Sequence, residues 1–173
     1  MNLGRVEVYI ITFLGYSSIS AIRSCYSATK KDINEQIDID IKYMGLIDAL
    51  MIAFLGLGHF LHAVYPVKKP VRTLWTCMLL CALNYSLIPV SMATSFLRNV
   101  YILSIVMCIN GYLQSFTWPN QLMLVNSKFD SQKNSTILGF WASAINIGSI
   151  IGMSTYSILR QINSTEDDKF FNL

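Results

Sequence analysis

Residues 109–121 read INGYLQSFTWPNQ and lie inside a run, 100–125, that contains no charged residue. This stretch decides the fold, because it combines the apolar length of a membrane helix with groups that lipid does not tolerate. An amide in hydrocarbon costs free energy unless it is hydrogen-bonded, and a proline removes one helix hydrogen bond. In a membrane helix such groups need partners other than lipid. The interruptions are Asn110, Gln114, Pro119, Asn120 and Gln121.

Composition extends this interpretation to the whole chain. Of its 173 residues, 53% are hydrophobic and only 13% are charged, and the mean hydropathy is +0.45. Soluble domains carry roughly 25% charged residues, so here the charge is too sparse to cover a water-facing surface. The net charge is +3, and the basic residues are scattered rather than clustered in a nucleic-acid-binding stripe. We therefore expect a multi-pass integral membrane protein whose partners include the lipid bilayer and exclude nucleic acid.

Five apolar runs are long enough to cross a bilayer, which takes about 20 residues. They cover residues 8–28, 43–65, 74–93, 100–125 and 137–159. Only helices and closed barrels satisfy backbone groups in lipid, and these runs are too long and too evenly apolar for barrel strands. The sequence predicts an all-α bundle of five transmembrane helices over residues 1–160, followed by a polar, acidic, disordered tail over 161–173.

The orientation of the bundle depends on the charges of the connections. If the N-terminus lies inside, lysines and arginines divide evenly between the two sides of the membrane. The short connection 66–72 is densely basic, with Lys68, Lys69 and Arg72 and no acid. Basic connections favour the inner side, so this one favours an inside N-terminus.

Arg23 is the sharpest signal within a span, because it lies about 22 Å along the first helix at 1.5 Å per residue. A charge inside a span costs at least about 2.5–3.5 kcal/mol on insertion scales. One interpretation is a fixed cation that meets an anionic substrate, since the guanidinium fork suits phosphate. The other is an arginine near a helix end whose head group reaches the membrane interface.

Asp48 and the two histidines are the remaining ionisable residues of the second run. Asp48 could pair with Arg23 if the first two helices pack antiparallel, or it could be a first-turn acid that the helix dipole favours. His59 and His62 share one helical face, but a metal site needs a third ligand and the chain has no other histidine. We expect polar packing for both histidines and no bound metal.

A further feature of the fifth run is a stripe of small residues. Ala144, Gly148 and Gly152 recur at four-residue intervals, a pattern that lets another helix approach closely. The chain contains no Gly-rich phosphate loop, no nucleophile elbow and no paired acid and base. We therefore expect neither an enzyme nor a cofactor.

Four motifs in this order resemble the organophosphate:phosphate antiporters of the major facilitator superfamily, which include glycerol-3-phosphate and glucose-6-phosphate exchangers. The fourth helix of that family reads approximately N-G-x-x-Q-S-x-x-W-P, and here Asn110, Gly111, Gln114, Ser115, Trp118 and Pro119 fit it. The matches in the fifth, second and first runs are Gly139, Trp141 and Gly148, then Gly45 and Asp48, then Tyr16 and Arg23. The resemblance covers about residues 8–155.

The resemblance implies roles for individual residues. The implied substrate-binding residues are Arg23, Tyr16, Asn110, Gln114 and Trp118. The implied gating or structural residues are Asp48, Lys68, Arg72, Pro119, Trp141 and Gly148. In such a protein the phosphate sits between two six-helix halves and is exchanged when the halves rock. The proline and the amides of the fourth helix then border a central cavity, where water and neighbouring helices satisfy them.

Several positions depart from the family pattern. Ile19 and Ser20 stand where the family has Tyr-His before the arginine, and Ile145 stands where glycerol-3-phosphate relatives carry a histidine. The superfamily loop G-x-x-x-D-R-x-x-x-R reads AVYPVKKPVR here, so its glycine and its acid are absent. The acid belongs to the cytoplasmic gating network of the family, so its loss puts gating in doubt.

The resemblance therefore predicts a sugar-phosphate or glycerol-3-phosphate/phosphate antiporter-like protein, with an organophosphate and inorganic phosphate as ligands. The family has twelve helices and this chain presents five, so we expect it to be incomplete without a partner chain or a second half. The alternative is a transport-inactive structural subunit of a larger membrane protein complex. The sequence leaves open whether the membrane is that of the endoplasmic reticulum, the mitochondrial inner membrane or the plasma membrane.

Overall fold

The computed structural model describes residues 4–37, 41–65, 67–93, 99–129 and 134–171. Across these ranges the chain is helical, with no strand. The helices are α1 Arg5–Ile37, α2 Ile41–Val64, α3 Pro70–Ala93, α4 Val100–Ser115, α5 Thr117–Asn126, α6 Asn134–Ala142 and α7 Ala144–Phe171. They provide five segments long and apolar enough to span a membrane: Arg5–Glu35, Lys42–Val64, Pro70–Val90, Val100–Asn126 and Ser135–Ile162. The predicted all-α architecture with five spans is confirmed.

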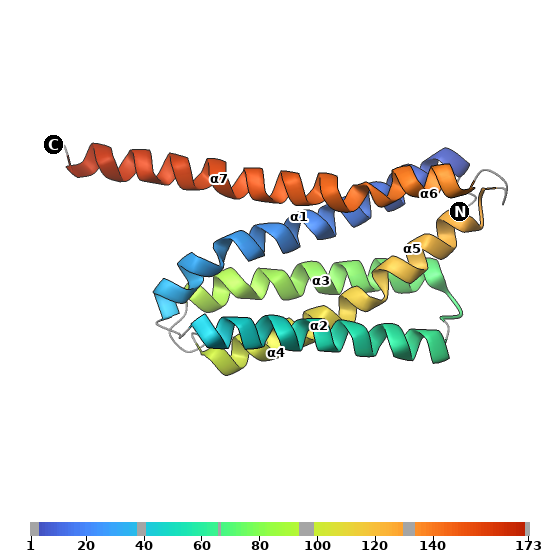
Figure 1. Ribbon diagram of the computed structural model, residues 1–173, viewed down its shortest axis with the longest axis horizontal. Helices are drawn as coiled ribbons and strands as arrows, with labels where there is room; N and C mark the ends of the chain where they lie inside the picture. The colour runs from blue at the N-terminus through green and yellow to red at the C-terminus, as the bar shows by residue number, and fades with distance from the viewer. Residues whose placement is uncertain (1–3, 38–40, 66, 94–98, 130–133, 172–173) are drawn as a thin grey trace.

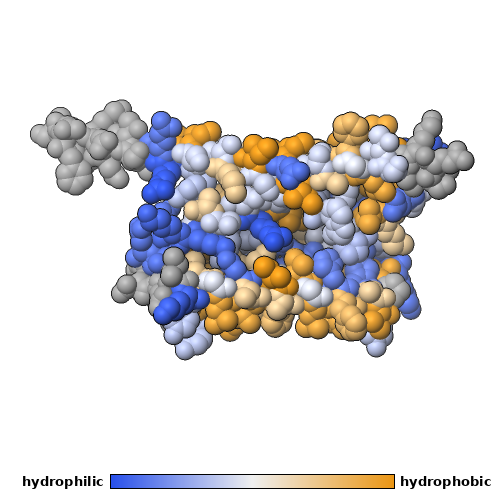
Figure 2. Space-filling model, viewed as in Figure 1, coloured by the Kyte–Doolittle hydropathy of each residue, from blue (hydrophilic) through white to orange (hydrophobic). Residues whose placement is uncertain are grey.

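The helices pack into a layered bundle (Figure 1). The α1 helix lies along α7 at one edge, α2 lies along α4 at the opposite edge, and α3 contacts both α4 and α5. A buried apolar cluster is formed by side chains from α1, α2, α3 and α4, and it includes Tyr26, Ile47, Met51, Tyr85 and Met107. Elsewhere large apolar side chains are exposed, as a lipid-facing surface requires. Figure 2 shows these hydrophobic areas at the two edges of the viewed face, with a hydrophilic strip between them.

The first helix is longer than the sequence predicted. It continues through Ile37, whereas the predicted run ended at residue 28. Its added turns carry Lys, Glu and Gln, which are good helix formers even though they are not membrane residues. Arg23 therefore lies in the middle of α1 rather than near its end.

The fourth span is broken at Phe116, where a single continuous helix was predicted. Pro119 has no N–H to donate to the carbonyl four residues earlier, so the hydrogen-bond ladder fails one turn before it. Side chains donate to carbonyls on either side of the lost bond: Thr117 Oγ1 donates to the Gln114 carbonyl at 2.7 Å, and Asn120 Nδ2 donates to the Phe116 carbonyl at 2.6 Å. The break thus explains how this span tolerates a proline and one of its amides.

The fifth span is also broken, at Ser143 between α6 and α7. The N–H and the hydroxyl of Ser143 both donate to the Phe140 carbonyl, at 3.1 and 2.6 Å. Beyond the span, α7 continues to Phe171 and projects past the bundle (Figure 1), whereas a disordered tail was predicted from residue 161. Extending an existing helix requires no new nucleus, which favours its continuation into polar sequence. Residues 172–173 lie outside the described ranges.

The small residues of the fifth span make the contact between α1 and α7. A Cβ atom on Gly148 would lie 2.1 Å from the Ser17 carbonyl oxygen, and one on Gly152 would lie 2.1 Å from that of Ala21. Only glycine fits at this separation, so the two backbones approach as the stripe predicted. This contact sets the position of α1, the helix that carries Arg23.

Candidate anion-binding site

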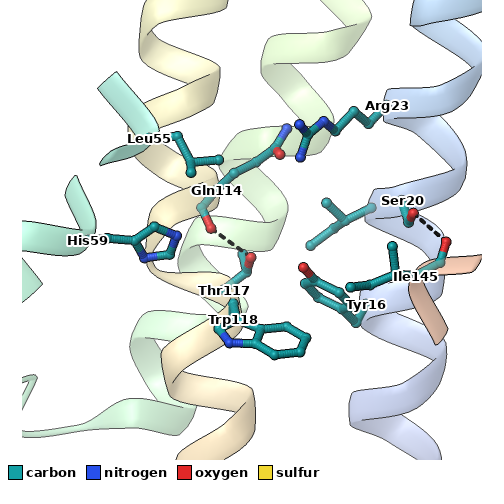
Figure 3. Close-up of a pocket in the computed structure, with 10 residues that line it drawn as sticks. Tyr16, Ser20, Arg23, Leu55, His59, Gln114, Thr117, Trp118 and Ile145 are labelled. Atoms are coloured by element: carbon teal, nitrogen blue, oxygen red, sulfur yellow. Dashed lines mark hydrogen bonds between the residues drawn. The ribbon is translucent and has the colours of Figure 1, made fainter. Parts of the chain in front are cut away.

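A hollow of about 300 Å³ opens where α1, α2, α4, α5 and α7 meet (Figure 3). It is lined by Tyr16, Ile19, Ser20, Arg23, Leu55, His59, Gln114, Thr117, Trp118 and Ile145. Four of the five predicted substrate-binding residues are therefore brought together: Tyr16, Arg23, Gln114 and Trp118. The fifth, Asn110, does not line the hollow.

Arg23 is the cationic wall of the hollow. Its side chain is exposed, and Figure 3 shows it extending from α1 towards the side chain of Gln114 on α4. Within the described ranges no carboxylate lies at ion-pair distance from its guanidinium. An unpaired charge in a membrane-spanning segment is unfavourable, so the site as it stands favours an anion.

Asp48 does not pair with Arg23, so the first of the two alternatives for this residue is wrong. Its Oδ2 atom lies 2.5 Å from Nζ of Lys30, and the two side chains are 36% and 26% exposed. Asp48 is not a first-turn acid either, because α2 begins at Ile41. The cause is the extension of α1, which carries Lys30 past the predicted helix end to lie opposite α2.

Two aromatic rings, those of Tyr16 and Trp118, form the floor of the hollow, and the ring of Trp141 lies behind them. The ring centroids of Tyr16 and Trp118 are 5.0 Å apart, and Trp141 lies 5.6 Å from Tyr16 and 5.0 Å from Trp118. Trp141 is fully buried behind the other two, and its indole N–H donates to Thr12 Oγ1 at 3.1 Å. Trp141, which belongs to α6, thereby fixes the positions of the Tyr16 and Trp118 rings.

The amides of the fourth span are held by α3 rather than by lipid. Asn110 is fully buried and its Nδ2 donates to Asn84 Oδ1 at 3.1 Å. Gln114 Nε2 donates to the Tyr85 hydroxyl at 3.0 Å and also to Asn110 Oδ1. Asn110 therefore positions Gln114, which in turn reaches the hollow. Gln121 differs, because both of its buried amide atoms lack a partner among the described residues.

The remaining predicted residues lie away from the hollow. Lys68 and Arg72 are exposed at the α2–α3 connection, at the end of the bundle where α1 begins (Figure 1). Pro119 is half-buried beside the break in the fourth span, and Gly148 faces α1. None of these residues lines the hollow, and their predicted gating or structural roles stay predictions.

Sequence reasoning missed His59, which lines the hollow from α2 together with Leu55, one turn before it (Figure 3). The four-residue spacing shows that these side chains share a helix face, but it does not show which face meets the hollow. Three positions that depart from the family motifs also line it, namely Ile19, Ser20 and Ile145. Among the described residues no three His, Cys, Asp or Glu side chains gather as a metal site would require.

Comparison with known proteins identifies relatives over most of the chain. Residues 12–161 match the family model described as Major Facilitator Superfamily.

Sugar phosphate exchanger 3 of Homo sapiens is 21% identical over 91% of this chain and 37% of its own length. A putative glycerol-3-phosphate transporter 3 of Arabidopsis thaliana is 24% identical over 86% of this chain and 32% of its own length. A glucose-6-phosphate exchanger of Homo sapiens is 30% identical over 62% of this chain and 21% of its own length. No solved structure gives a significant match. The chain thus spans less than two fifths of the length of these relatives.

Proposed function

The chain belongs to the Major Facilitator Superfamily, and on that premise we propose that it carries a phosphate-bearing organic anion across a membrane in exchange for inorganic phosphate. The relatives are named as exchangers or transporters of sugar phosphates and glycerol-3-phosphate, which supports this class of substrate. The phosphoryl group is the part that these substrates share, so the site is considered for that group first.

The observation that carries the proposal is Arg23, an exposed guanidinium on a spanning helix with no carboxylate partner in the described part of the chain. A guanidinium presents parallel N–H donors that match two oxygens of a phosphoryl group. The hollow beside it, of about 300 Å³, offers room for a small anion. Binding an anion there would neutralise a charge that otherwise stays uncompensated in the membrane.

The other lining residues support the same ligand. The rings of Tyr16 and Trp118 form an apolar floor for the carbon skeleton of the substrate, and the Tyr16 hydroxyl can donate to an oxygen. Gln114 is pre-positioned by its hydrogen bond to Tyr85, so it loses little freedom on binding. In this proposal Arg23 binds the phosphoryl group, and the floor distinguishes an organic phosphate from phosphate alone.

Exchange also requires a surface that covers the open side of the hollow. Without such a surface the exposed Arg23 would face lipid, which is unfavourable for a charge. We propose that a second helical bundle provides it and that alternating access comes from rocking between the two bundles.

The test is phosphate exchange by the chain reconstituted in phosphate-loaded liposomes, in which a second copy of the chain can supply the second bundle. We expect uptake of labelled phosphate that is lost in Arg23→Gln and kept in Arg5→Gln, which removes an exposed arginine from the first turn of the same helix. Exchange that persists in Arg23→Gln would refute the proposed role of the guanidinium. If the unmodified chain shows no exchange and co-purifies in a complex of fixed stoichiometry, the transport-inactive structural subunit is the better description.

A further inference from the structure

Lys30 is a second cation on the same face of α1 as Arg23. The two residues are seven positions apart, which is about two helical turns and about 10 Å along the axis. Residues at this spacing point in nearly the same direction, because seven residues complete almost two full turns. Tyr16 lies seven positions before Arg23 on the same line. One stripe of α1 therefore carries the ring of Tyr16, the guanidinium of Arg23 and the ammonium of Lys30, in that order.

The ammonium of Lys30 borders a hollow of its own. This hollow, of about 450 Å³, lies between α1 and α2 and is lined by residues that include Ser27, Lys30, Lys31, Asn34 and Asp48. The charged groups of its lining are two lysines and one aspartate. Lys31 is largely exposed and lies 3.8 Å from Glu35 on its own helix, so Lys30 is the cation that the second helix holds.

A continuous set of contacts joins the two hollows. The ammonium of Lys30 lies 5.4 Å from the centroid of the Tyr26 ring, and that ring lies 6.4 Å from the ring of Tyr85. The Tyr85 hydroxyl accepts a hydrogen bond from Gln114, which lines the hollow of Arg23. The packed rings of Tyr26 and Tyr85 therefore connect Lys30 to Gln114, the residue that faces Arg23.

We propose that Lys30 is a second phosphoryl-binding station, at which the carboxylate of Asp48 occupies the anion's place until the substrate displaces it on its way to Arg23. The inference rests on the proposed function, since it concerns the same anion. The exposure of both partners makes displacement feasible, because a solvent-accessible ion pair contributes little to stability. A phosphoryl group carries more negative charge than a carboxylate, so it competes effectively for one ammonium group.

The test is the rate at which inorganic phosphate reaches the Arg23 hollow. The chain has three tryptophans: Trp118 lines that hollow, Trp141 packs against Trp118, and Trp75 is 59% exposed on α3. In a Trp75→Phe background the remaining fluorescence reports arrival of phosphate at the hollow. Stopped-flow mixing of phosphate with the full chain in lipid nanodiscs then gives the association rate constant.

We expect Asp48→Asn to raise the association rate constant about 3- to 10-fold, because it removes the competitor, and Lys30→Gln to lower it by a similar factor. Lys31→Gln tests for general attraction by charge, since Lys31 lines the same hollow but is 73% exposed and lies 3.8 Å from Glu35 rather than from Asp48. The double variant Lys30→Gln with Asp48→Asn carries no uncompensated charge at the pair and should bind phosphate as slowly as Lys30→Gln alone. This variant separates loss of the station from a folding defect.

The outcomes separate the station from the proposed function. If Arg23→Gln abolishes the fluorescence change but Asp48→Asn leaves the rate constant unchanged or lowers it, the station is refuted and the function stands. If Lys31→Gln slows arrival as much as Lys30→Gln, the effect is general attraction and the station is again refuted. If neither the unmodified chain nor Asp48→Asn gives a signal with phosphate, both proposals fail.

Discussion

At the scale of single residues, Trp141 shows how a buried side chain can define a binding surface that it does not itself form. Its ring is fully buried and contacts both rings that line the hollow, while its N–H is satisfied by Thr12. A tryptophan is large and has a single donor, so it fits a site that provides one acceptor and tight packing on all sides. The floor of the hollow therefore depends on a residue from α6.

We predict that Trp141→Phe lowers the free energy of unfolding by about 1–3 kcal/mol, since it removes one hydrogen bond and leaves a void. Thermal unfolding in detergent would measure the change. The matched control is Trp75→Phe, at a position that is 59% exposed, where the effect should stay within about 0.5 kcal/mol. Equal melting temperatures for the two variants would contradict the buried role of Trp141.

Much of the candidate site could be predicted at this scale, but its pairings could not. An arginine within an apolar run needs a polar environment wherever the helix packs, so the sequence alone indicates Arg23. Its relation to Asp48 depended on where α1 ends, and hydropathy marks the end of the apolar run near Ala28 but not the end of the helix. His59 was missed for a related reason, because its neighbours in the hollow come from other helices.

At the scale of helices, the contact between α1 and α7 controls the position of the cation. The two backbones meet at Gly148 and Gly152, where no side chain intervenes. Ser20 adds a polar link, since its hydroxyl donates to the Ile145 carbonyl at 2.8 Å. A close contact of this kind holds α1 at a fixed distance and rotation, and so fixes the direction in which Arg23 points.

We predict that Gly148→Ala destabilises the bundle by about 1–3 kcal/mol, because its methyl group would overlap the Ser17 carbonyl and force the helices apart. Gly139→Ala is the control, since a Cβ atom there has no neighbour within 4 Å. On helix propensity alone the control should be up to about 1 kcal/mol more stable than the unmodified chain. Thermal unfolding of both variants in one detergent would show the difference, and a stable Gly148→Ala would argue against the close contact.

The existence of the helices could be read from hydropathy, and their breaks only in part. Pro119 predicts an irregularity in the fourth span. The break lies one turn before it, because proline has no N–H to donate to the carbonyl of the preceding turn. The break at Ser143 has no proline to announce it, and its hydrogen bonds to Phe140 are formed within a single turn. Such local competition between a serine hydroxyl and the backbone ladder does not alter the hydropathy pattern.

At the scale of the whole molecule, the charged connections lie at two opposite ends of the bundle (Figure 1). The end of α1, with Lys31, lies near the start of α2, while Lys68 lies between α2 and α3 at the other end. A single crossing separates these two connections, so they face opposite sides of the membrane. The basic connection favours the inner side, and with it an inside N-terminus.

In cells that carry the protein in the plasma membrane, we predict that a membrane-impermeant maleimide labels Lys31→Cys before permeabilisation and labels Lys68→Cys only after it. The variants are made in a background in which the four native cysteines are replaced by alanine. Labelling of Lys68→Cys alone in intact cells would reverse the orientation. Labelling of both variants from one side would contradict the crossing of α2.

The interruptions at Phe116 and Ser143 have a mechanical consequence, because each lies beside one of two indole rings in contact, Trp118 in one span and Trp141 in the other. The fourth and fifth spans are thus both least stiff at the same level, where the two indole rings are in contact. Flexing of α5 and α6 would pivot on the indoles, while unbroken α1 keeps Arg23 stationary. One end of the molecule could then swing without carrying the guanidinium along with it.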